Sequence, residues 1–250
     1  MVVWSTVSAP ERKAFVEGFA YRHHRRLHIT FQCVRSFVTY SANTVRSQMF
    51  ESQMAYLHHQ GYRVIHLADI YDFLQGQGSL PKKAVVITID DGFKSTYTIA
   101  YPILKKYGFP VTLFVYSNFI SLPGSLSWNQ MSEMVNSTLV DIQSHLKTHA
   151  NLALAQANES SEAYEHRIQQ EIQHTARQIK QHLNLPAHTF SYPYGDTNDI
   201  VVEQLKKSVF RMAATVQRGG NACFADPLRS CLKNLRTYKN NDLGCHMQSI

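Results

Sequence analysis

The chain has 250 residues, of which 44% are hydrophobic and 17% are charged, which excludes a disordered protein and suffices for one large core. This length fits a single α/β barrel-type domain better than two unrelated domains. The formal net charge is +7, but the basic residues are scattered apart from the cluster at 22–26, so we do not expect nucleic acid as the partner.

The four cysteines, at positions 33, 223, 231 and 245, form no CxxC pair, which argues against a disulfide framework or a structural zinc knot. Residues 1–15 lack the basic start and apolar segment of a signal peptide. No stretch approaches the roughly 20 apolar residues of a membrane span. The sequence as given therefore predicts no membrane span and no export signal.

From about residue 44 onward, short β-branched runs alternate with segments of helical periodicity. The predicted helices are Phe50–Gln60, Ala68–Leu74, Tyr97–Tyr107, Trp128–Val135, Ser160–Leu183 and Val201–Ser208. The predicted strands are Tyr62–His66, a central strand beginning at Ala84, Val111–Tyr116, Leu139–Ser144, Thr189–Tyr192, Arg211–Thr215 and Leu235–Tyr238. This alternation predicts a parallel sheet, open or closed into a barrel.

The central strand is the most informative segment, because its apolar run ends in two adjacent carboxylates and a glycine. Val85–Ile89 has no polar face, which is typical of a parallel strand covered on both sides. Asp90, Asp91 and Gly92 follow at its carboxyl end, where ligands bind in sheets of this kind. Side chains alternate across a strand, so both acids can face one site only if the strand breaks up there.

A histidine pair follows the strand Leu139–Ser144 in the same way. His145 and His149 are four residues apart, so that on one helical turn or in a tight loop their rings can converge on one ion. Two imidazoles and one carboxylate suit a catalytic Zn²⁺ or a similar divalent ion. The pair alone also fits solvated histidines, and the aspartates at another strand end shift the balance to a metal.

A third strand end carries the turn Pro193–Gly195. Proline has no N–H, so the amides of Tyr194 and Gly195 are the ones available to hold an oxyanion.

These motifs, in this order, resemble the NodB-homology polysaccharide deacetylases, carbohydrate esterase family 4. They read TIDDG at 88–92, SHLKTH at 144–149 and SYPYG at 191–195. The segments 80–93, 149–152 and 218–229 look most like the poly-N-acetylglucosamine deacetylase branch. The resemblance covers about Ser47–Leu243 and implies a distorted (β/α) barrel with mostly parallel strands. We therefore expect a deacetylase domain over 47–250, preceded by an N-terminal segment, 1–46, packed on the barrel.

The resemblance also implies an activity, the removal of N-acetyl groups from N-acetylglucosamine units of a polysaccharide such as poly-N-acetylglucosamine, a chitin-like polymer or a peptidoglycan glycan. Asp91, His145 and His149 would ligate a divalent metal, with Zn²⁺ as the first expectation. Asp90 would be the general base that activates water. The partner would be the N-acetylated polysaccharide or oligosaccharide itself.

The same resemblance assigns the turn after the third strand to the substrate. The amide of Tyr194 would stabilise the oxyanion, within a substrate-binding loop that includes Tyr192, Pro193 and Gly195. Tyr192, Tyr194 and Trp128 would offer aromatic faces to sugar rings, although core packing explains Trp128 equally well.

The sequence departs from the family pattern at three places, and the last two favour an alternative that the intact Asp90, Asp91, His145 and His149 argue against. Ser191 stands where many members have arginine, and Leu146 stands where serine or threonine is usual. The family's Leu-His-Asp motif near the C-terminus, which carries the general acid, is not recognisable. The most similar segment is Leu243–His246. The alternative is therefore a catalytically weak or inactive carbohydrate-binding relative, and a third reading is a hydrolase of other amides or esters. The resemblance implies a cell-envelope or secreted protein, which we reconcile with the absent signal peptide by expecting a truncated or misassigned start.

Overall fold

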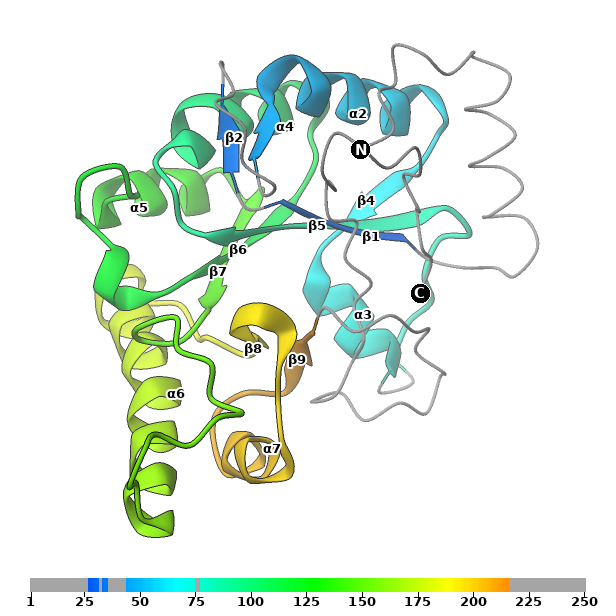
Figure 1. Cartoon of the computed structure of the whole chain (residues 1–250). Helices are drawn as coiled ribbons and strands as arrows, with labels where there is room; N and C mark the ends of the chain where they lie inside the picture. The colour runs from blue at the N-terminus through cyan, green and yellow to red at the C-terminus, as the bar shows by residue number, and fades with distance from the viewer. Residues whose placement is uncertain (1–26, 32, 36–43, 75–76, 216–250) are drawn as a thin grey trace, which may run out of the picture.

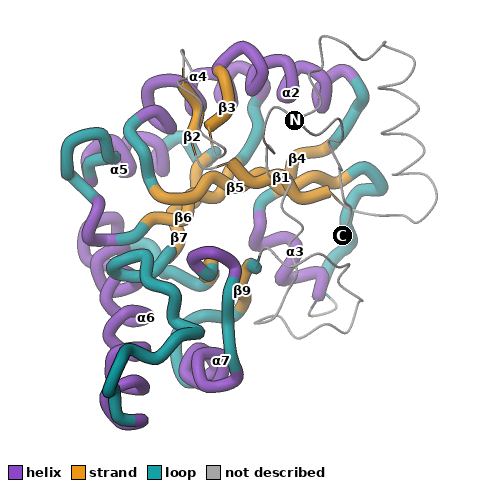
Figure 2. The backbone as a smooth tube through the Cα atoms, in the orientation of Figure 1, coloured by secondary structure: helices purple, strands orange, loops and turns teal. Residues whose placement is uncertain are grey.

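The structure is a computed structural model that describes residues 27–31, 33–35, 44–74 and 77–215. Seven of the described strands form one parallel sheet: β1 (Leu27–Phe31), β4 (Arg63–Ile65), β5 (Ala84–Asp91), β6 (Val111–Val115), β7 (Val140–Ser144), β8 (Thr189–Ser191) and β9 (Met212–Ala214). A separate parallel pair consists of β2 (Cys33–Arg35) and β3 (Thr44–Arg46). Figure 2 shows the strands in the middle of the molecule with helices around them.

The strand order is β1-β5-β6-β7-β8-β9, and β4 also pairs with β5. The described helices are α2 (Ser47–His59), α3 (Leu67–Leu74), α4 (Tyr101–Tyr107), α5 (Trp128–Asn136), α6 (Ser161–Leu183) and α7 (Asp199–Lys206). Figure 1 shows α2, α4 and α5 on one side of the central strands and α3 on the other, with the sheet curving away from β5 towards β9. This arrangement confirms the predicted distorted barrel with parallel strands.

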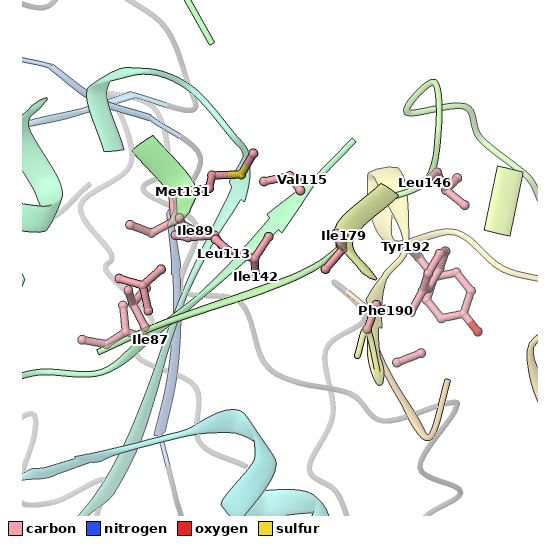
Figure 3. Packing of buried hydrophobic residues seen from close by; sticks show 14 of the residues in the cluster. Ile87, Ile89, Leu113, Val115, Met131, Ile142, Leu146, Ile179, Phe190 and Tyr192 are labelled. Carbon is pink, nitrogen blue, oxygen red and sulfur yellow. The ribbon is translucent and has the colours of Figure 1, made fainter. Parts of the chain in front are cut away.

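Strand β5 is buried on both faces, as its unbroken apolar run predicts. Val85, Ile87 and Ile89 belong to the large core that the sheet forms with α2, α4, α5, α6 and α7, and part of this core is shown in Figure 3. Val86 points to the opposite face, where it packs with Leu67 and other buried residues of a smaller cluster. By the same alternation, Asp90 belongs to the face of Val86.

The predicted elements from Phe50 to Thr215 are all present, with shifted ends. The helix predicted over Tyr97–Tyr107 begins with a π-helical turn, Thr96–Ala100, before α4. Pro102 lies in the first turn of α4 and has no N–H to donate to an earlier carbonyl. Helix α7 starts before the predicted Val201, because the side chain of Asn198 accepts a hydrogen bond from the Val201 amide at 2.9 Å and caps the helix.

Other predictions fall outside the described residues. These are the strand Leu235–Tyr238, the family-like segment 218–229 and the segment Leu243–His246. Within 1–46, the structure describes β1, which pairs in parallel with β5, and the β2–β3 pair. The boundary after residue 46 stays a prediction.

Within the described residues, none of the helices combines the length and apolar character needed to cross a membrane.

One half-buried carboxylate lies near the start of a strand, away from the carboxyl ends of the sheet. Both carboxylate oxygens of Asp141, on β7, accept from Nε2 of Gln143 at 3.0 Å. Burial is the largest cause acting on this carboxyl and raises its pKa above the usual 3.8, although the Gln143 bond opposes the shift. Ionised Asp141 therefore destabilises the folded chain as the pH rises above the usual pKa.

We expect Asp141→Asn to raise the midpoint of thermal unfolding at pH 7, because asparagine keeps an oxygen for Gln143 and carries no charge. The difference from the unmodified protein should vanish below about pH 4, where the aspartate is protonated in both the folded and the unfolded chain. Thermal melts from pH 3 to pH 8 measure this, with Asp72→Asn on the exposed face of α3 as the control. An equal gain at all pH values would show that charge is not the cause.

Candidate metal centre

The register of the sheet brings the carboxyl ends of four strands into one row. Asp91 of β5 pairs with Val115 of β6. Val115 pairs in turn with Ser144 of β7, and Ser144 pairs with Phe190 of β8. Because parallel strands all point the same way, the segments that follow lie along one edge of the sheet. The three motifs of the sequence therefore meet at one place.

Strand β5 does break up at the two carboxylates. Asp90 is 7% exposed and still extended, whereas Asp91 has a φ of 73°, in the left-handed region. Gly92 follows with a φ of 79°, and a Cβ at this position would lie 3.1 Å from Cγ1 of Val115. The tight turn therefore requires glycine, and it releases Asp91 from the alternation of the strand.

Asp91, His145 and His149 offer ligand atoms that all lie within 4.8 Å of one another. Oδ1 of Asp91 is 3.6 Å from Nε2 of His145 and 3.3 Å from Nε2 of His149. The same oxygen is buried, and within the described residues no hydrogen bond satisfies it. A buried oxygen that faces two imidazole nitrogens without a donor fits a divalent cation, so the group is compatible with a metal site.

The orientation of His145 is fixed by the neighbouring strand. Its Nδ1 lies 2.8 Å from the carbonyl oxygen of Ser191 on β8, so Nδ1 carries the hydrogen and Nε2 is left to face Asp91. Burial lowers the pKa of His145 to about 4, against the opposing effect of Asp91. The imidazole is therefore neutral at neutral pH, as a metal ligand must be.

The two histidines lie in a loop and not on a helix. Leu146 and His149 both have positive φ, of 70° and 63°. Each such residue costs roughly 1–2 kcal/mol in backbone strain, so the surrounding structure must hold the loop in place. The side chain of Leu146 is fully buried in the large core.

Tyr116 is a site residue that the sequence analysis did not single out. It directly follows β6, and its ring lies 5.2 Å from that of His149 and 5.2 Å from that of Phe119, measured between centroids. Burial, followed by the charge of Asp91, raises the pKa of its phenol, which therefore stays protonated. Its position at the end of the strand between the aspartates and the histidines was the available signal.

Four residues were predicted to bind substrate in the turn after β8. Two of them, Gly195 and Tyr192, have their predicted binding groups engaged elsewhere. The Gly195 amide donates to the carbonyl of Tyr192 at 2.9 Å, so it closes the turn and is not available for an oxyanion. The side chain of Tyr192 is 2% exposed and packs edge-on against Phe190 (Figure 3), so its ring offers no face to a sugar. The amide of Gly195 is thus engaged within the turn itself, and the ring of Tyr192 is engaged in the core, so neither group is presented as expected.

Tyr194 is placed differently. It is 56% exposed, and its ring lies 5.0 Å from that of His149 in an edge-on arrangement. Its φ of 61° turns the chain between buried Pro193 and Gly195. The Tyr194 amide is thus the one that remains of the two predicted oxyanion donors, and its ring stands at the open side of the site.

Trp128 lies in α5, and its ring stacks on that of His182 at 4.3 Å with an interplanar angle of 13°. The tryptophan is also packed against the large core. Of the two roles considered for it, packing is the one that these contacts support.

Comparison with known sequences agrees with this geometry. A sequence model of the polysaccharide deacetylase family matches residues 77–213, which is more than half of the chain and includes the three motifs. The chain therefore belongs to the polysaccharide deacetylase family, as the motifs indicated.

Individual relatives place the chain within that family. Poly-beta-1,6-N-acetyl-D-glucosamine N-deacetylase of Escherichia coli (strain K12) is 27% identical over 210 residues, covering 70% of this chain and 31% of that protein. The protein of the same name from Staphylococcus epidermidis is 28% identical over 193 residues, covering 74% of this chain and 66% of that protein. The structure of IcaB from Ammonifex degensii is 28% identical with a TM-score of 0.68, covering 77% of this chain and 84% of that chain. The chain thus spans less than a third of the length of the E. coli relative.

We expect His145→Ala and Asp91→Ala to abolish metal retention, because each removes one of three ligands from the group. The measurement is the metal content per chain after dialysis, determined by elemental mass spectrometry. The control is His59→Ala, which removes an exposed imidazole from the last turn of α2. A full equivalent of metal in either ligand variant would contradict the assignment.

Proposed function

We propose that this chain is a metal-dependent hydrolase that removes N-acetyl groups from N-acetylglucosamine units of a polysaccharide. The observation that carries the proposal is the convergence of Asp91, His145 and His149, with a buried and unsatisfied oxygen, at the strand ends of a polysaccharide deacetylase fold. Two imidazoles and one carboxylate form a ligand set that leaves coordination positions open, which is typical of catalytic zinc. We therefore propose Zn²⁺ as the ion.

Each remaining site residue has a role in this proposal. A divalent ion, when bound, would polarise the amide carbonyl and lower the pKa of a water molecule. Asp90, at the same strand end, would accept the proton of the attacking water. The Tyr194 amide would donate a hydrogen bond to the amide oxygen as negative charge develops on it. The products are acetate and a free amine on the sugar.

The named relatives support a substrate class. Both the E. coli and the S. epidermidis proteins are poly-beta-1,6-N-acetyl-D-glucosamine deacetylases by name. We propose the same polymer, or oligomers of it, as the substrate of this chain. The exposed ring of Tyr194 beside His149 would form an apolar wall for a pyranose ring.

Acetate release tests the proposal directly. The assay compares β-1,6- and β-1,4-linked N-acetylglucosamine oligomers, each with chelator-treated protein and with zinc-reconstituted protein. Release that requires the metal and prefers the β-1,6 linkage supports both the activity and the substrate. Oligomer binding without release, by protein that holds one metal per chain, would favour the carbohydrate-binding alternative.

We expect Asp90→Asn to keep the metal and to lose about 10²–10⁴-fold in the rate of acetate release, the range typical of losing a general base. Asparagine has nearly the same size as aspartate but cannot accept the proton from water. Asp72→Asn, which removes a carboxylate from the exposed face of α3, should release acetate at the unmodified rate. Full activity of Asp90→Asn would rule out Asp90 as the base.

A further inference from the structure

The loop between the two histidines is bonded to helix α6 at every residue. The three intervening residues are Leu146, Lys147 and Thr148, and each makes at least one hydrogen bond to Glu171 or Thr175 of that helix. Helix α6 follows this loop in the chain and, as Figure 1 shows, runs beside the end of β7.

Glu171 makes three of these bonds with its side chain. Oε2 accepts the backbone N–H of Lys147 at 3.1 Å and that of Thr148 at 2.9 Å, and Oε1 accepts the hydroxyl of Thr148 at 2.7 Å. The residue is 7% exposed. Hydrogen bonds to an ionised acceptor are among the stronger ones, and a buried carboxylate must have such partners.

Thr175 holds the beginning of the same loop, one helical turn further along. Its hydroxyl donates to the carbonyl oxygen of Leu146 at 2.6 Å and lies 2.9 Å from Oγ of Ser117, which begins the 3₁₀ turn Ser117–Phe119 after β6. Glu171 and Thr175 are four residues apart, so they present their polar groups on one face of the helix. The two side chains thus fasten both ends of the short segment between the ligands.

The backbone of the loop explains why such fastening is needed. Leu146 and His149 both adopt positive φ, a conformation that non-glycine residues avoid. The bonds from α6 therefore oppose relaxation of the loop, together with backbone hydrogen bonds from the amides of Ser117 and Asn118 to the carbonyls of Leu146 and Lys147. We propose that Glu171, assisted by Thr175, is the positioning residue that holds His149 in the geometry that binds the metal.

This inference rests on the proposed metal site, and it assigns to α6 a function beyond packing. If Glu171 served packing alone, its removal would lower the stability of the fold and leave the affinity of the folded protein for the metal unchanged. Partners of metal ligands that act by orientation instead change the affinity, typically by 10–100-fold.

The experiment is a titration of the metal-free full chain with Co²⁺ and with Zn²⁺, for the unmodified protein, Glu171→Ala, Glu171→Gln and Glu165→Ala. We expect Glu171→Ala to weaken binding by about 10–100-fold and to change the visible absorption spectrum of bound Co²⁺, which reports ligand geometry. Glu171→Gln should restore both, because its oxygen can accept the two amides and its NH₂ can donate to Thr148 Oγ1. Glu165→Ala removes a carboxylate of α6 that bonds Gln204 instead, and should bind as the unmodified protein does.

Thermal melts of the metal-free variants establish that each is folded. If Glu171→Ala does not fold, the same metal titration of Thr175→Val tests the inference. This variant keeps the shape of the side chain and removes the hydroxyl that holds Leu146. Unchanged affinity and spectrum in the folded variant overturn the inference while the metal site stands. Failure of the unmodified protein to bind either ion overturns the proposed function together with the inference.

Discussion

The site depends on the alignment of parallel strands at one edge of the sheet. Asp91, Val115, Ser144 and Phe190 form a single row of paired residues, so whatever follows each of them is delivered to the same place. The chemistry-bearing residues are supplied mainly by three strand ends that are far apart in the chain. A shift of one residue in any of these pairings would turn side chains to the opposite face and separate the ligands.

Around this row, the protein fixes each member of the candidate ligand group, Asp91, His145 and His149, through neighbouring groups. The carbonyl of Ser191 orients His145 from β8, the turn at Gly92 releases Asp91 from its strand, and helix α6 secures the loop that carries His149. Four of the eight non-glycine residues with positive φ in the described chain lie in this small region: Asp91, Leu146, His149 and Tyr194. Strained backbone conformations are often concentrated at functional sites, where the function requires a geometry that is locally unfavourable.

The sequence was sufficient to predict what depends on local patterning. Apolar periodicity predicted the elements from Phe50 to Thr215, and strand ends predicted that the aspartate pair would meet His145 and His149. The choice of Asp91 over Asp90 as the ligand came from the family resemblance. It could not predict contacts that depend on packing. Glu171 has the pattern of an ordinary polar residue in an amphipathic helix, and only the fold shows that it faces the histidine loop. Likewise, nothing in the sequence of residues 191–195 indicates that the Gly195 amide is hydrogen-bonded within the turn while the Tyr194 amide is not assigned such a bond.

The separation of the ligands along the chain has a consequence for folding. Asp91 ends β5 and the histidines follow β7, with β6 lying between these strands in the sheet. An unfolded chain cannot present this ligand set, so an ion held there would bind the folded state alone and add its binding free energy to the stability of the fold. The centre would then couple the assembly of the middle of the sheet to the supply of the ion. Scarcity of the ion would leave the protein less resistant to unfolding as well as unable to act.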